Sequence, residues 1–203
     1  KALELSMFLS LPASIALFIG SEEIISALFG YGSFNEFAVN NSAKALYYFG
    51  LGLPAFALIK VFSTFFFANH DTKTPFYISL ISVILNISVS IYYFESIGFM
   101  IIPISTTISS WFNSLILFIF LINRNLFKFN NIFPIKFIKI IFASILMGIF
   151  FKYLILFFEN YLTYDYSFKS FYLVLSVLLS FSFYVILSLF IKAFKYNDIK
   201  LKY

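Results

Sequence analysis

The chain contains no cysteine and very little charge. Its 203 residues are 11% charged and 62% hydrophobic. Without cysteine, disulfide bridges and thiolate metal sites are excluded. About a quarter of the residues of a typical soluble domain are charged, so this chain cannot cover a water-facing surface. Disorder requires low hydrophobicity, and the composition therefore predicts an integral membrane protein.

Glycine, proline and histidine are also scarce. Seven glycines and five prolines exclude low-complexity and collagen-like chains. His70 is the single histidine, and one neighbouring aspartate gives it neither a metal site nor the partners of a catalytic base. The sequence has no phosphate loop, dinucleotide fingerprint or zinc motif, and its lysines are too scattered for a nucleic-acid surface. We therefore expect no metal, cofactor or nucleic acid, while coupling to an ion or to the membrane potential stays open.

Long apolar runs are the main feature of the sequence. A helix that crosses a bilayer needs about 20 mainly apolar residues. Six runs meet this requirement and predict an all-α protein with six transmembrane helices, at residues 5–20, 45–68, 76–94, 97–122, 140–158 and 170–191. The shorter apolar stretch at 24–29 either continues the first helix after a break or forms an interfacial piece.

The basic residues divide unequally between the two sides that six spans define. Ten of the fourteen lie on the side that holds both chain ends, namely Lys1, Lys73, Arg124, Lys128, Lys136, Lys139, Lys192, Lys195, Lys200 and Lys202. The opposite side has only Lys44, Lys152 and Lys169. Because positive residues favour the cytoplasm, we expect both ends to be cytoplasmic.

Lys60, the remaining basic residue, lies inside a span. A lysine at the centre of a span costs about 2.5–3.5 kcal/mol, and such charges usually face a bundle interior or a water-filled cavity. Lys60 is therefore a candidate for contact with an anionic substrate. The alternative is that it extends to the interface or pairs with a carboxylate. Lys152, inside the fifth span, is interpreted as a lysine whose side chain extends to the outer headgroups rather than as a substrate-binding residue.

Three further features of the spans are candidates for function. Asn86 and Asn113 each lie on a face of small polar residues, which indicates either close helix packing or the polar wall of a transport pathway. Gly50, Gly52 and Pro54 interrupt the second span. Breaks of this kind are often found near the sites and gates of transporters.

Two stretches of sequence resemble a known family. Residues 52–61 read GLPAFALIKV and residues 66–75 read FFANHDTKTP. They resemble the MurJ (MviN) family of lipid II flippases in the MOP exporter superfamily, whose pattern is G-L-P-A-F-x-L-x-K-V followed by F-Y-A-x-x-D-T-x-T-P. The loop motif falls on Asp71, Thr72, Thr74 and Pro75, and the resemblance covers about the first 125 residues.

The resemblance implies half of a two-lobe transporter. Residues 1–125 would be four helices of the C-terminal lobe. Residues 126–203 would be two extra helices that form a lipid-tail groove, with Ser144 and Gly148 as groove candidates. The chain would then be an incomplete part of a fourteen-helix protein.

The function implied is transport, not catalysis. Relatives of this kind move the undecaprenyl-linked peptidoglycan precursor across the bacterial cytoplasmic membrane by alternating access, which serves cell-wall synthesis. The partners implied are this precursor, membrane lipids and the N-terminal half of the transporter. Three alternatives stay open: another exporter of the superfamily, for polysaccharide precursors or drugs; an enzyme acting on polyprenyl substrates; and a structural membrane subunit. The spans have no carboxylate for coupling a drug exporter, and the short loops disfavour an enzyme.

Overall fold

The computed structural model describes residues 1–126 and 133–193. In these residues the fold is helical and has no strand. The elements are α1 (Ala2–Ile19), α2 (Ser21–Phe29), α3 (Glu36–Ala68), α4 (Lys73–Ile97), the 3₁₀ turn η1 (Gly98–Met100), α5 (Ile101–Asn123), α6 (Phe133–Phe157), the 3₁₀ turn η2 (Glu159–Tyr161) and α7 (Lys169–Phe190).

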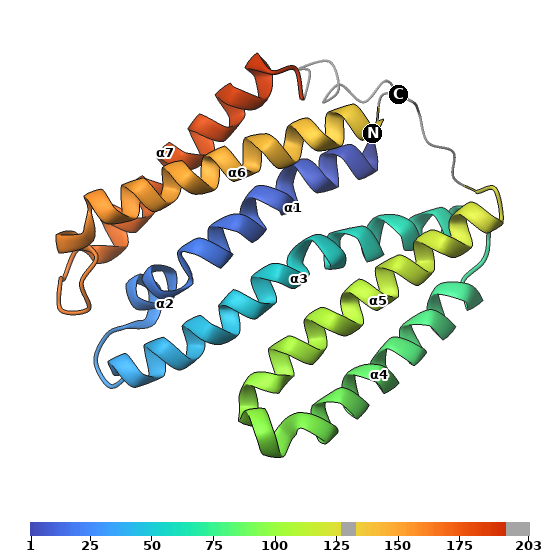
Figure 1. The fold of residues 1–203 in the computed structure, drawn as a ribbon, viewed down its shortest axis with the longest axis horizontal. Helices are drawn as coiled ribbons and strands as arrows, with labels where there is room; N and C mark the ends of the chain where they lie inside the picture. Colours follow the sequence, from blue (N-terminus) through green and yellow to red (C-terminus); the bar gives the residue numbers. More distant parts are fainter. Residues whose placement is uncertain (127–132, 194–203) are drawn as a thin grey trace.

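Six long helices confirm the six expected spans. Five continuous helical stretches of the described chain are long and apolar enough to cross a membrane, and one of them extends over Lys73–Asn123. This stretch is a hairpin of α4 and α5, which turns through η1 (Figure 1). Gly98 begins the turn with φ +70°, a conformation that glycine adopts without a steric penalty.

The starts of three expected spans differ from the helices by four or more residues, and α6 begins at Phe133 rather than at 140. The fourth span was expected from residue 97, but Ile97 ends α4 and α5 begins at Ile101. Helix α3 begins at Glu36, before the expected start at 45, because the side chain of Asn35 accepts a hydrogen bond from the Ala38 N–H at 2.9 Å and caps the helix. Hydrophobicity marks the membrane-embedded part of a helix, whereas the polar cap marks its true beginning.

The first span ends in a sharp break. Helix α1 stops at Gly20, and α2 follows as a separate short helix. A Cβ at Gly20 would lie 2.6 Å from the Phe151 ring, so the break allows α1 to pack closely against α6.

The long helices lie side by side in the order α4, α5, α3, α1, α6, α7 (Figure 1). Phe62, Phe66, Leu117 and Leu121 form the buried contact between α3 and α5. Tyr184 of α7 is buried against Phe8 of α1, with ring centroids 5.0 Å apart. The expected division at residues 125–126 coincides with the end of α5 and stays a prediction.

The helix ends gather at two opposite ends of the molecule, as the alternating direction of six spans requires (Figure 1). We call one the lysine-rich end; it holds the N-terminus, the α3–α4 loop, the end of α5, the start of α6 and the end of α7. We call the other the acidic end; it holds α2, the α4–α5 turn and the α6–α7 loop. Lys128, Lys195, Lys200 and Lys202 lie outside the described residues.

Candidate functional site

Pro54 breaks the hydrogen-bond ladder of α3. Proline has no N–H, so the carbonyl four residues earlier, that of Gly50, has no donor within the helix. The Ser14 hydroxyl of α1 donates to this carbonyl at 2.7 Å, and the bond is buried. A neighbouring helix therefore supplies the missing bond, as is usual for proline in membrane helices.

Helix α5 supplies two further donors to the same break. The Thr107 hydroxyl donates to the Tyr48 carbonyl at 2.7 Å, and the Trp111 indole N–H donates to the Leu51 carbonyl at 3.1 Å. Gly52 makes the approach possible, because a Cβ there would lie 2.9 Å from the Thr107 hydroxyl oxygen. The break is thus stabilised from both sides, while its role in gating stays a prediction.

Lys60 lies two turns beyond this break, on an exposed face of α3. Among the described residues it has no ion pair or hydrogen bond. Pairing with a carboxylate, one of the two alternatives, is therefore not realised in this part of the chain. The uncompensated charge is available to an anionic ligand or to lipid headgroups.

Asn86 and Asn113 line one polar hollow of about 280 Å³ between α4 and α5. The Asn86 amide donates to the Thr106 and Ser109 hydroxyls at 3.1 and 3.2 Å. The Asn113 amide donates to Ser79 at 3.4 Å. Both asparagines therefore bond across the helix interface, which is the packing role expected of such faces. The Asn113 Oδ1 is buried without a hydrogen-bond partner, and Ile59, the residue before Lys60, lines the same hollow.

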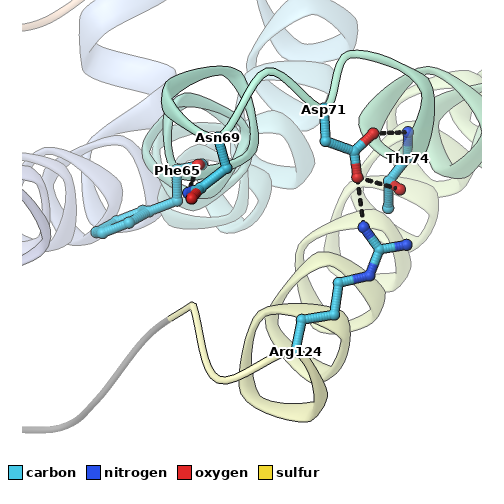
Figure 2. Close-up of polar contacts among 5 residues, drawn as sticks. All are labelled: Phe65, Asn69, Asp71, Thr74 and Arg124. Carbon is cyan, nitrogen blue, oxygen red and sulfur yellow. Dashed lines mark hydrogen bonds and ion pairs between the residues drawn. The ribbon is translucent and has the colours of Figure 1, made fainter.

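The loop between α3 and α4 explains the Asp-Thr-x-Thr-Pro motif (Figure 2). One Asp71 carboxylate oxygen accepts from the Thr74 N–H at 3.0 Å, and the other accepts from the Thr74 hydroxyl at 2.6 Å and from Arg124 of α5. Thr72 makes no side-chain cap, and the Asp71 carboxylate caps α4 instead. Pro75 lies buried in the first turn, where its missing N–H costs nothing. The motif therefore begins α4 and ties it to α5.

The cap makes this loop insensitive to moderate acid. The two hydrogen bonds from Thr74, aided by Arg124, lower the pKa of Asp71 from 3.8 to about 2. Because the pKa is lower in the folded state, the stabilisation is complete above pH ~4 and is lost as the pH falls towards 2. We expect the difference in thermal midpoint between the wild type and Asp71→Asn to be constant from pH 7 to pH 4 and to shrink below it. The exposed Asp165→Asn is the control, and a difference that vanishes already near pH 6 would contradict the assignment.

The two groove candidates of α6 differ in position. Ser144 is fully buried and donates to the Ile140 carbonyl at 2.8 Å, so a lipid tail cannot contact it in this structure. Gly148 borders an apolar hollow between α1 and α6. A Cβ at Gly148 would lie 2.5 Å from Ile15, which makes it a site of close helix packing as well.

Lys169 is the residue that sequence reasoning missed. It begins α7 and is 0% exposed. Its ammonium donates to the carbonyls of Gly30 and Tyr164 at 2.6 and 2.5 Å and lies 4.4 and 4.5 Å from the ring centroids of Tyr31 and Tyr164. The adjacent Ser170 donates to the Ala27 carbonyl at 2.6 Å. Together these contacts fasten α7 to α2. The one sequence signal for this role of Lys169 was its position directly before an apolar run.

Six apolar helices in antiparallel succession, two of them with a buried proline inside the helix, define a multi-pass helical membrane protein. A family model described as lipid II flippase MurJ matches residues 1–175. The chain is 40% identical over 124 residues to a probable lipid II flippase MurJ of Rhizobium meliloti, a match that covers 61% of this chain and 23% of the relative. It is 36% identical over 143 residues to that of Thermotoga maritima, covering 70% and 28%.

A solved structure shows the same fold. The lipid II flippase MurJ in an inward closed conformation superimposes with a TM-score of 0.76 at 24% identity, covering 97% of this chain and 38% of that one. The chain belongs to the lipid II flippase MurJ family. It spans about a quarter of the length of the curated relatives given above.

Proposed function

We propose that this chain is part of a transporter that moves the lipid-linked peptidoglycan precursor, lipid II, across the bacterial cytoplasmic membrane. The observation that carries the proposal is the family match over residues 1–175, which includes the proline-broken α3 and Lys60. Both relatives described above are named for this activity. A part of about a quarter of their length supplies one portion of the pathway and works together with the rest of the transporter.

The proposed mechanism is alternating access. Lys60 has no carboxylate partner in the described chain, so its charge is free to attract the pyrophosphate of the precursor. The break at Pro54 replaces one rigid ladder bond with a bond between α3 and α1, and it is the proposed flexing point of α3. Helices α6 and α7 would lie beside the lipid tail.

A complementation experiment tests this function together with Lys60. The complete protein is expressed in a bacterium depleted of its own lipid II flippase, and we expect it to restore growth. Lys60→Ala, at equal membrane abundance, should reduce rescue by about tenfold or more, since each 1.4 kcal/mol of lost substrate binding is a factor of ten in affinity. Lys44→Ala, at the acidic end, should rescue fully.

The outcomes separate the two claims. No rescue by the well-expressed wild type would contradict the function. Full rescue by Lys60→Ala would keep the function and assign Lys60 to the lipid interface.

The proposed orientation places the lysine-rich end in the cytoplasm. Because this chain has no cysteine, a cysteine introduced into it reports its side of the membrane, provided that any cysteine elsewhere in the complete protein is first replaced by serine. In intact cells we expect a membrane-impermeant maleimide to label Ser96→Cys and Thr163→Cys, and to label Lys73→Cys only after permeabilisation. The opposite pattern would reverse the orientation.

A further inference from the structure

An apolar hollow and a carboxylate-lined cavity meet at one lysine. The hollow, of about 610 Å³, lies between α1 and α6, and its lining includes Ile15, Gly148 and Ile149. The cavity, of about 560 Å³, lies at the acidic end between α2 and the α6–α7 loop. Lys152 and Leu156 line both. We call them the tail hollow and the headgroup cavity.

Lys152 is free to bind an anion at this junction. Its side chain is exposed, and among the described residues it has neither a hydrogen bond nor an ion pair. It lies five residues before the end of α6, roughly 7 Å along the helix axis. A lysine near the end of a membrane helix extends its ammonium to the interface while its methylene stem stays on apolar surface.

Carboxylates dominate the other side of the headgroup cavity. Its acidic residues are Glu22, Glu23, Glu36, Glu159 and Asp165. No cluster of the described chain has the three or more ligands that a metal ion needs, so the surroundings favour a larger organic cation. Burial raises the pKa of Glu23, although Lys152 opposes this effect, and an ammonium group would favour its ionised form.

We propose that this junction binds a phospholipid whose headgroup carries a primary amine. One acyl chain occupies the tail hollow, the phosphate contacts Lys152, and the ammonium lies among the carboxylates. Charge complementarity selects this occupant: an apolar slot, one cation and then several anions follow the order of groups in a zwitterionic lipid. A lipid with a glycerol headgroup matches the first two features and not the third.

Lipid titration of the complete protein tests the proposal. The delipidated protein is titrated in detergent with dioleoyl phosphatidylethanolamine and with dioleoyl phosphatidylglycerol, and bound lipids are counted by native mass spectrometry. We expect phosphatidylethanolamine to bind more tightly and Lys152→Gln to weaken it about tenfold. Lys44→Gln, a lysine at the same end that lines neither cavity, should leave binding unchanged. The double variant Glu22→Gln, Glu159→Gln should remove the preference between the two lipids.

A photo-crosslinker identifies the occupant directly. Ile149 is 62% exposed and lines the tail hollow, so a photoreactive amino acid is tolerated there. In cells it should capture phosphatidylethanolamine. Capture of the lipid-linked precursor or of another segment of the transporter would overturn the proposal, as would equal affinity for both lipids or unaltered binding by Lys152→Gln.

Discussion

Replacing Lys169 with alanine should destabilise the protein by about 2–4 kcal/mol. The substitution leaves two carbonyls without their donor, that of Gly30 in a buried bond and that of Tyr164 in a partly buried one. A buried acceptor without a partner costs about 1–3 kcal/mol, and the contacts of the ammonium with two tyrosine rings are lost as well. We expect a lower thermal midpoint of the purified protein and faster proteolysis of the α6–α7 loop, because this lysine fastens α7 to α2.

Two comparisons separate the lost hydrogen bonds from lost volume and charge. Lys169→Met keeps most of the volume but has no donor, and it should be nearly as unstable as the alanine variant. Lys44→Ala removes an exposed lysine of the same end and should change the midpoint little. If Lys169→Ala and Lys44→Ala had equal midpoints, the fastening role of Lys169 would be wrong.

The second large effect is a coupling between Ser14 and Pro54. Ser14→Ala should cost about 1–2 kcal/mol, because the Gly50 carbonyl loses the buried donor that replaces the missing N–H of Pro54. With Pro54→Ala, the new N–H at position 54 can donate to that carbonyl, so Ser14→Ala should then cost almost nothing. The expected coupling free energy is about 1 kcal/mol or more, which a double-mutant cycle on the purified protein measures.

The same pair of variants distinguishes stability from function. Pro54→Ala restores the ladder of α3 and should stabilise the helix, yet we expect it to impair rescue in the complementation test if α3 flexes at this point. Additive stability effects of the two substitutions would show that the Ser14 hydroxyl does not substitute for the missing N–H.

The spans and the end of the molecule at which each begins could be predicted from the sequence because they depend on hydrophobicity along the chain. Apolar runs with little or no charge set the number of helices, and their alternation in direction set which helix ends lie together. The cap of α4 was also predictable, since an Asp-Thr-x-Thr-Pro sequence offers few ways to begin a helix. Each of these features is local in the chain.

The roles of Lys169 and Ser144 could not be predicted because they depend on contacts between distant segments. From its place in the sequence Lys169 resembled the lysines that only mark topology. Its hydrogen-bond partners are two backbone carbonyls, which no side-chain motif can indicate. Ser144 shares a helical face with Gly148, but only the packing of α6 shows that the serine is buried and the glycine borders a hollow. The donors that serve the Pro54 break lie on α1 and α5 for the same reason.

A flipping measurement shows directly whether the complete protein moves lipid II between leaflets. The purified protein is reconstituted in vesicles with fluorescent lipid II, and a membrane-impermeant reductant then bleaches the headgroups that it reaches. We expect protein-dependent bleaching of the inner-leaflet pool, slowed in Lys60→Ala but not in Lys44→Ala, with an imposed ion gradient or potential where one is required. An inner-leaflet pool that stays protected under all these conditions, while another lipid-linked saccharide crosses, would contradict transport of lipid II by this protein.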